Sequence, residues 1–395
     1  MRCAKAGCAI LMLILSAMSA GQIKKAPNAT GQPDVPGITV FGDSITCGSD
    51  ASTLSLAYSY LLQFDFGSPS TIWCRSGDQA EDMARLWVYP HTNPANTRNV
   101  PVTVLIGTNN AYLYGGSGAG YASNFQNSLR ASLTWLAIPS SNKILGQSAG
   151  VTKTGTWTND NTLFSGSAIK STVNRSTARF SITTTGQPIY IGYRAFDSNT
   201  GTATLTIDGL LQGTLNAFGA APIATFKGET DTVFVQRYPV SAGSHPVVIA
   251  VNSSTAASNI FSFVWAGTPD YPFNPKVISP PRVFVGGVIR EQSDANPTYT
   301  STYDAYVQSV AAQLAGDGLP VTYVRARDYV NATTDMDDIV HPNDAGHGHL
   351  RDAFENAIRT NSSGFSDARN VYAPAPSRIS GDSNVNALAL ANAQR

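Results

Sequence analysis

The pattern of apolar residues changes twice along this 395-residue chain, and these changes restrict the folds that it can adopt. Up to about residue 149, and again after residue 267, short apolar runs alternate with stretches rich in helix-forming residues. This order is typical of a parallel sheet with helices on both faces. Residues 150–267 instead contain short runs in which apolar and polar residues alternate, separated by turn residues. That spacing predicts a β-sandwich, so we expect an all-β insertion within one α/β domain.

The apolar runs outside the insertion are the expected strands of the parallel sheet. They are short and mostly apolar, as expected of strands that are buried on both faces. The predicted strands are Ile38–Phe41, Thr71–Cys74, Pro101–Ile106, Arg282–Gly286 and Val321–Val324. Helices are expected at about residues 54–64, 79–87, 121–137 and 302–314, with a last helix that reaches about Arg359. Within the insertion, strands are expected at Ala178–Ile182, Ile189–Tyr193, Ala203–Ile207, Val233–Val235, Val247–Val251 and Ile260–Trp265.

Three of the predicted parallel strands end in segments suited to acyl transfer. Ser44 follows the first strand, at the edge where open α/β sheets bind ligands, so its hydroxyl is a candidate nucleophile. Gly77 and Asn109 follow the next two strands and would bring a backbone N–H and a side-chain amide to the same edge, as donors for an oxyanion. Taken singly, each segment has a structural alternative, because Gly-Asp-Ser, Gly77 and Asn109 are all ordinary turn residues.

A serine nucleophile needs a base, and the sequence contains five histidines. The segment Asp338-Ile-Val-His341 places a carboxylate three residues before an imidazole. On a loop or a first helical turn, this spacing lets the carboxylate hold one ring nitrogen and fix the tautomer. The other four histidines lie in the predicted sandwich, in a polar loop or on the predicted last helix. We therefore expect His341 to be the base and Asp338 to orient it.

Four segments together resemble the four sequence blocks of the SGNH hydrolases, also called the GDSL esterase/lipase family. They are Phe41-Gly-Asp-Ser44, Gly77, Gly107-Thr-Asn-Asn110 and Asp338-Ile-Val-His341. The segments appear in the family's order, and the resemblance covers about residues 36–146 and 269–360. It implies an α/β fold of the flavodoxin-like kind, with three α/β/α layers around a small parallel sheet.

The resemblance also implies a role for each candidate residue. Ser44 would attack the ester carbonyl, and His341, oriented by Asp338, would take the serine proton and return it to the leaving alcohol. The N–H groups of Ser44 and Gly77, with the amide of Asn109, would form the oxyanion hole. One position departs from the family, since Asn110 stands where an Asp is usual. This departure changes the hydrogen bonding next to Asn109 and leaves the oxyanion residue itself in place.

The two ends of the chain complete the predicted organisation. Residues 1–20 combine a short basic start, an apolar core too short to cross a bilayer and small residues before a cleavage site. They predict a signal peptide and a secreted or periplasmic protein without a membrane anchor after cleavage; a retained anchor is the alternative. The predicted divisions are a signal peptide (1–20), a linker (21–35), the hydrolase domain (36–149 and 268–361), the inserted sandwich (150–267) and a disordered tail (362–395).

Export leaves two cysteines, Cys47 and Cys74, each three residues from a predicted site residue. A disulfide and a pair of buried thiols both remain open from the sequence. The insertion carries aromatic residues that either stack on sugar rings or form its core. They are Trp157, Tyr190, Tyr193, Phe196, Tyr238 and Trp265.

Composition narrows the partners of the predicted enzyme. The formal net charge of +0 argues against nucleic acid, which needs a basic face. The histidines lack the spacing of metal ligands and no phosphate-binding glycine motif occurs, so we expect neither metal nor cofactor. Export, neutral charge and the lack of a lipid-binding apolar stretch favour an esterified, in the first place acetylated, carbohydrate as substrate. Two alternatives stay open: a lipase or general carboxylesterase, and a non-catalytic secreted glycan-binding protein.

Overall fold

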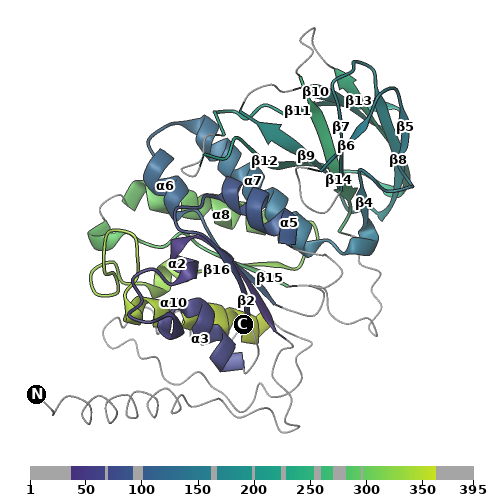
Figure 1. Cartoon of the computed structure of the whole chain (residues 1–395). Helices are drawn as coiled ribbons and strands as arrows, with labels where there is room; N and C mark the ends of the chain where they lie inside the picture. The colour runs from purple at the N-terminus through teal and green to yellow at the C-terminus, as the bar shows by residue number, and fades with distance from the viewer. Residues whose placement is uncertain are drawn as a thin grey trace, which may run out of the picture.

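The computed structural model describes most of the chain between residues 37 and 361 (Figure 1). The described ranges are 37–66, 70–91, 101–161, 167–197, 201–223, 228–252, 259–269, 282–294 and 297–361. The predicted signal peptide, linker and tail lie outside them. Among the helices within these ranges, none has the length and apolar character needed to cross a membrane.

A five-stranded parallel sheet, in the order β16-β15-β3-β1-β2, forms the first half of the fold. Its strands are β1 (Ile38–Gly42), β2 (Ser70–Cys74), β3 (Val102–Leu105), β15 (Val283–Gly286) and β16 (Val321–Val324). Every residue of β3 and β15 is buried, which explains why these runs carry almost no polar residues. The expected mixed α/β architecture with a parallel sheet is confirmed.

Helices cover both faces of this sheet (Figure 1). Because successive strand residues point to opposite faces, Val40 packs with helices α3 (Tyr58–Phe66) and α10 (Asp344–Asn361), while Phe41 packs with the helices opposite. Those on the second face are α7 (Ala119–Ala137) and α8 (Pro297–Gly316). The result is a helix–sheet–helix arrangement in three layers.

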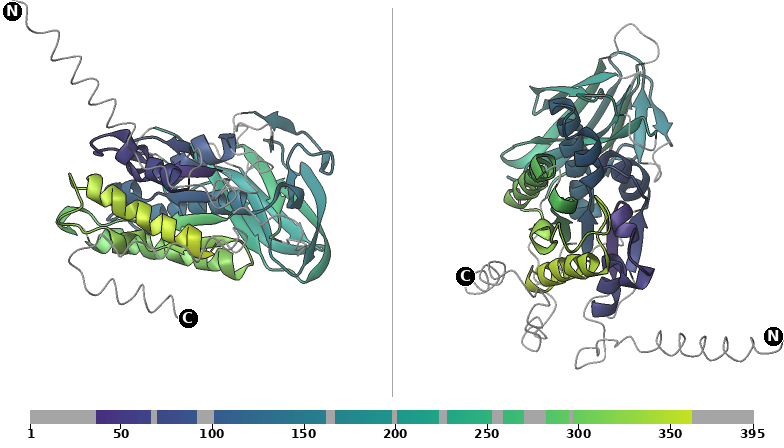
Figure 2. Two further views of the ribbon diagram at one scale, coloured as in Figure 1. Left: turned by 90° about the horizontal axis from the view of Figure 1, so that it is seen from below. Right: turned by 90° about the vertical axis from the view of Figure 1, so that its left-hand side faces the viewer.

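Two antiparallel sheets form the second half of the fold, at the other end of the molecule from α10 (Figure 2). One sheet has the order β11-β10-β13-β8-β5 and the other β12-β9-β14-β7-β6, with β4 paired to β14. Their strands are β4 (Lys143–Leu145), β5 (Thr152–Thr154), β6 (Thr158–Asp160), β7 (Ala168–Ser171), β8 (Thr177–Thr185), β9 (Ile189–Phe196), β10 (Thr202–Ile207), β11 (Leu210–Asn216), β12 (Asp231–Tyr238), β13 (Ala242–Asn252) and β14 (Phe261–Gly267). The sheets face each other, since Phe180 on β8 stacks on Phe263 of β14 at 5.4 Å between ring centroids.

The second antiparallel sheet also packs against α7 of the first half. Its residue Trp265 is fully buried, lies edge-on to Trp135 of α7 and donates its indole N–H to the Tyr89 hydroxyl at 2.9 Å. Val233 and Tyr190 belong to the same apolar cluster as the residues of α7 and α8. The core beneath the parallel sheet therefore continues into the sandwich without a break.

Partly buried ion pairs join the same two halves. Asp231 of β12 forms ion pairs through its Oδ2 with two arginines. Arg194 Nη2, from the same sheet, lies at 2.5 Å, and Arg85 Nε, from the π-helical segment Met83–Val88, lies at 3.0 Å. Asp317, just after α8, accepts both arms of Arg237 and the hydroxyl of Tyr190. Each carboxylate thus binds at least one side chain from the other half of the fold.

Most of the insertion's aromatic residues are core residues. Tyr190 and Trp265 are fully buried, and Tyr193 and Tyr238 are 2% and 8% exposed. Trp157 is half-buried, packs against the sandwich core and donates its indole N–H to the Thr177 carbonyl. Of the two interpretations that the sequence left open, the structure favours a packing role for these side chains.

Candidate active site

Ser44 lies directly beyond β1, as the first residue of the short helix α2 (Ser44–Cys47). The turn into this helix requires glycine at position 42. A Cβ atom there would lie 1.9 Å from Thr46 Oγ1 and 2.4 Å from the carbonyl oxygen of Leu105. The serine is therefore held at the carboxyl end of the parallel sheet by a turn that no larger residue permits.

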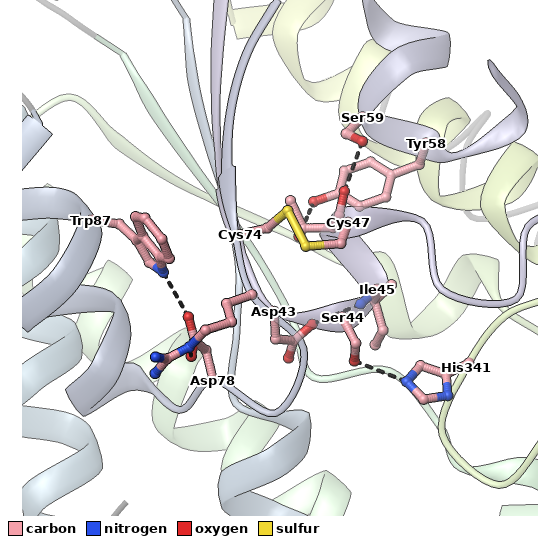
Figure 3. Close-up of a disulfide and its surroundings, with 12 residues drawn as sticks. Asp43, Ser44, Ile45, Cys47, Tyr58, Ser59, Cys74, Asp78, Trp87 and His341 are labelled. Carbon is pink, nitrogen blue, oxygen red and sulfur yellow. Dashed lines mark hydrogen bonds and ion pairs between the residues drawn. A yellow bond between two sulfur atoms is a disulfide. The ribbon is translucent and has the colours of Figure 1, made fainter. Parts of the chain in front are cut away.

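Side chains around α2 hold it in place (Figure 3). Asp43 caps the helix, because its Oδ1 accepts the N–H of Ile45 at 3.1 Å. Thr46 Oγ1 is hydrogen-bonded to the Tyr58 hydroxyl at 2.8 Å, and Ser59 donates to the Thr46 carbonyl at 2.8 Å. Helix α3 thus fixes the segment that carries the candidate nucleophile.

A disulfide joins Cys47 to Cys74, with 5.5 Å between their Cα atoms. It links the end of α2 to the end of β2, and so the loop of Ser44 to the loop of Gly77 (Figure 3). The sequence is compatible with either a disulfide or two thiols, and the structure contains the disulfide.

His341 lies within hydrogen-bond distance of Ser44, although almost the whole chain separates them. Its Nε2 is 2.9 Å from Ser44 Oγ, and its Nδ1 is 2.8 Å from Asp338 Oδ2 (Figure 3 shows the first of these contacts). Asp338 Oδ1 also accepts the backbone N–H groups of Val340 and His341, at 2.8 and 2.6 Å. Partial burial raises the pKa of Asp338, but these hydrogen bonds outweigh it and hold the pKa below its ordinary value.

A second carboxylate, from Asp50, also approaches His341. Its Oδ2 is 3.2 Å from His341 Nδ1. The described residues contain one group that could hold a metal ion, formed by Asp50, Asp338 and His341, whose ligand atoms lie within 4.8 Å of one another. Sequence reasoning missed Asp50, because a polar turn residue after a helix gives no sign of a distant partner.

Gly77 occupies a tight turn after β2. Its φ of +84° lies in the left-handed region, and the turn is closed by the Asp78 N–H, which donates to the Arg75 carbonyl at 3.2 Å. The buried carboxylate of Asp78 accepts hydrogen bonds from the side chains of Arg75 and Trp87, both at 2.6 Å. These bonds fix the turn that presents the Gly77 backbone.

Asn109 connects the loops of the two other predicted oxyanion residues. It lies in the first turn of α6 (Thr108–Tyr114). Its Nδ2 donates to the Asp78 carbonyl at 2.9 Å and lies 3.4 Å from Asp43 Oδ2. Since Asp78 follows Gly77 and Asp43 precedes Ser44, the structure brings the three predicted loops together.

Asn110, the position that departs from the family pattern, is buried below the site. Its Oδ1 accepts the Ala80 N–H at 3.0 Å and its Nδ2 donates to Glu81 Oε2 at 2.9 Å. Burial raises the pKa of Glu81 to about 7, although the bond from Asn110 works against the shift. An amide at this position can serve both a donor and a carboxylate acceptor, which an ionised Asp cannot do.

Asp43 is a further buried carboxyl of the site. Burial raises its pKa to about 7, against the hydrogen bond from Ile45, and the nearby Asp78 carboxylate adds to the shift. The carboxyl therefore keeps its proton to a higher pH than an ordinary Asp does, while its Oδ1 caps α2.

The other histidines described at side-chain level have different partners. His347 is fully buried on α10, with Nε2 at 3.2 Å from the Ser49 carbonyl, and burial lowers its pKa. His349 binds Asp335, and His245 on β13 binds Asp208. His341 is the histidine that meets the candidate nucleophile.

Comparison with known proteins finds similar solved structures. No protein-family model matches the chain, and no curated protein does. Among solved structures, the chain is similar to a two-domain esterase (CEX) active on acetylated mannans, co-crystallised with mannopentaose, with 13% identity and a TM-score of 0.36 over 67% of this chain and 95% of the other. It is also similar to a carbohydrate-binding module CBM36 in complex with calcium and xylotriose, with 19% identity and a TM-score of 0.24 over 31% of this chain and 96% of the other. A CBM35 from Cellvibrio japonicus matches with 17% identity and a TM-score of 0.24, over 32% of this chain and 90% of the other. TM-scores this low do not establish a shared fold, so function has to be argued from the site.

Proposed function

We propose that this protein is an exported serine esterase of the SGNH type that removes acyl groups from a carbohydrate. The acyl group that we favour is acetyl. The observation that carries the proposal is the chain of contacts from Ser44 Oγ through His341 to Asp338, at 2.9 and 2.8 Å. A serine, an imidazole and a carboxylate in this order form the arrangement that activates a hydroxyl for acyl transfer.

In the proposed mechanism, Ser44 Oγ attacks the ester carbonyl carbon while His341 Nε2 takes the serine proton. Asp338 holds the Nδ1–H and stabilises the imidazolium that forms. The tetrahedral intermediate collapses, and His341 gives the proton to the leaving alcohol. Water then attacks the acyl-serine with His341 again as base, which releases the carboxylic acid and regenerates Ser44.

The oxyanion would be bound by the N–H groups of Ser44 and Gly77 and by the amide of Asn109. One Asn109 N–H is committed to the Asp78 carbonyl at 2.9 Å. The contact to Asp43 is longer, 3.4 Å, and is therefore the weaker of the two hydrogen bonds. That second N–H is the one that an oxyanion would recruit.

The carbohydrate assignment has support beside the site as well as in the sequence. Tyr112 follows Asn109 by three residues on α6, which places the two on neighbouring positions of the helix surface. Its side chain is 52% exposed, and an exposed aromatic ring provides an apolar face on which a sugar can stack. Because the insertion's aromatic residues are mostly buried, we assign sugar contact to this surface in place of the insertion.

In this proposal residues 36–149 and 268–361 form the hydrolase domain around the inserted residues 150–267, and residues 1–20 direct export. The test is turnover of p-nitrophenyl acetate and acetate release from acetylated xylan, pectin and peptidoglycan, with Ser44→Ala as control. Activity on the short ester and on one acetylated polymer that is lost in Ser44→Ala supports the proposal. If wild type and Ser44→Ala are equally inactive, the proposed esterase activity is refuted. A preference for long-chain p-nitrophenyl esters indicates the lipase alternative.

A further inference from the structure

His341 Nδ1 faces two carboxylates where one would suffice for the proposed mechanism. Asp338 Oδ2 lies at 2.8 Å and Asp50 Oδ2 at 3.2 Å. Neutral imidazole with its proton on Nδ1 has a single N–H there, so both oxygens compete for or share one donor. The distance to Asp338 is typical of a charge-assisted hydrogen bond, and the distance to Asp50 is at the upper end of the range for N–H···O bonds.

The two carboxylates come from different parts of the chain. Asp338 is bound to the backbone of Val340 and His341, so it belongs to the loop of the base. Asp50 belongs to the loop of the nucleophile, because the Ser49 N–H donates to the Ser44 carbonyl at 2.9 Å. Asp50 therefore connects the segment that carries the nucleophile to the imidazole that activates it.

The conformation of this segment brings the Asp50 carboxylate to the histidine. Gly48 ends α2 with a φ of +85°, and Asp50 has a φ of +64°, a left-handed conformation that Asp and Asn tolerate better than most residues. Two residues later, Ser52 donates from its N–H and its hydroxyl to Asp344, at 2.8 and 2.7 Å. The loop after α2 is thus held against the His341 region at a second point.

We propose that Asp50 is a positioning residue that shares the Nδ1–H of His341 with Asp338, so that each carboxylate partly replaces the other when one is lost. This proposal rests on the proposed esterase function of the same site. Asp43 and His347 also interact electrostatically with His341. Within the part of the chain that the structure describes, the ion pairs of His341 Nδ1 are those with Asp50 and Asp338.

The test is a double-mutant cycle with Asp50→Asn, Asp338→Asn and the double variant, measured as kcat/KM on p-nitrophenyl acetate. Asn keeps the left-handed preference at position 50, removes the charge and replaces one acceptor oxygen with an amide donor. We expect losses of about tenfold for Asp50→Asn and about a hundredfold for Asp338→Asn, and about ten-thousandfold for the double variant, the effect of removing the only acid of a triad. A double loss larger than the product of the single losses is the signature of mutual replacement.

The pH profile separates positioning from a structural role. Removing a negative charge beside the imidazolium moves the acid limb of kcat/KM to lower pH in Asp50→Asn. Asp337→Asn, which removes the neighbouring exposed charge of the same loop, is the control and should keep the wild-type profile. An NMR titration of the His341 ring in wild type and Asp50→Asn makes the same comparison in the absence of substrate.

Three outcomes would overturn the inference. Wild-type kcat/KM and pH profile in Asp50→Asn would show that Asp50 does not act on the imidazole. Multiplicative losses in the double variant would show two independent effects. Loss of activity with EDTA, restored by a divalent cation, would mean that the carboxylates hold an ion. An active Ser44→Ala variant, in contrast, would refute the proposed function.

Discussion

Removing the disulfide between Cys47 and Cys74 should destabilise the fold much more than it slows catalysis. The bridge closes a loop with a sequence separation of 27. In the chain-entropy model, a loop of this length lowers the entropy of the unfolded chain by about 12 cal/mol/K. The corresponding stabilisation is about 3.5 kcal/mol at 25 °C, a large part of the stability of an ordinary protein.

Catalysis should suffer less because the helix of the nucleophile has other anchors. Asp43 caps α2, and the Tyr58 and Ser59 side chains bind Thr46 at 2.8 Å each. These contacts do not depend on the disulfide, so Ser44 should keep its place as long as the protein is folded. We expect kcat/KM to fall by no more than about threefold, which is under 1 kcal/mol of transition-state stabilisation.

The assay is urea unfolding followed by tryptophan fluorescence, with p-nitrophenyl acetate hydrolysis in dilute urea. Reduced wild type and the Cys47→Ala/Cys74→Ala variant should unfold at the same urea midpoint, and this midpoint should be lower than that of oxidised wild type. An unchanged midpoint in the double variant would contradict the entropy argument. Hydrolysis that disappears well below the unfolding midpoint would show that the bridge, and not the hydrogen bonds, positions Ser44.

Three further predictions follow from the site. Tyr112→Ala should raise KM for the acetylated polymer by about tenfold, as expected for a lost aromatic stacking contact, and leave hydrolysis of p-nitrophenyl acetate within about twofold; equal effects on both substrates would refute sugar stacking. Asn110→Asp removes the donor to Glu81 and should lower the free energy of unfolding by about 1–3 kcal/mol in urea at pH 7; wild-type stability would count against the buried hydrogen bond. Burial raises the pKa of Asp43 and Glu81 to about 7, so the folded chain binds their protons more tightly than the unfolded chain does. Stability should therefore fall as pH rises from about 4 to 7, by up to about 1.4 kcal/mol per pH unit for each group, and Glu81→Gln should flatten this dependence; a slope equal to that of wild type would refute it.

The sequence predicted the parallel sheet well because burial on both faces leaves a strong local pattern. Val102–Leu105 and Val283–Gly286 have no solvent face, so each appears as an almost unbroken apolar run. Two strands of the antiparallel sheets, β5 and β11, escaped prediction because they have little buried surface. All three residues of Thr152–Thr154 are exposed, and so are most residues of Leu210–Asn216.

The candidate site divides in the same way between local and long-range information. The proposed roles of Ser44 and His341 rest on segments with a recognisable order, so the sequence was enough to suggest the pair. Asp50 has no such segment, and its contact with His341 exists only because the fold brings the turn after α2 against a distant loop. Charged turn residues are common, and three-dimensional proximity alone distinguishes this one.

The position of the insertion explains how Ser44 and His341 can meet across it. Strand β4 lies just before residue 150, where the insertion begins, and pairs with β14, the last strand of the insertion. The chain therefore leaves and re-enters the α/β part at neighbouring points. Beyond the insertion the chain returns as β15, which pairs directly with β3, the strand before Asn109. An insertion with adjacent ends leaves the sheet order of its host undisturbed.

The same insertion is also part of the core, which changes how its role should be tested. Trp265 is fully buried between the sandwich and the helix that carries Trp135, and its indole N–H binds Tyr89. Deleting residues 150–267 would expose this face of α7, so loss of activity would report loss of the fold. Residues 150–267 pack against the helix layer behind the parallel sheet. We propose to test polymer binding on the exposed surface beside Asn109, where single substitutions leave the shared core intact.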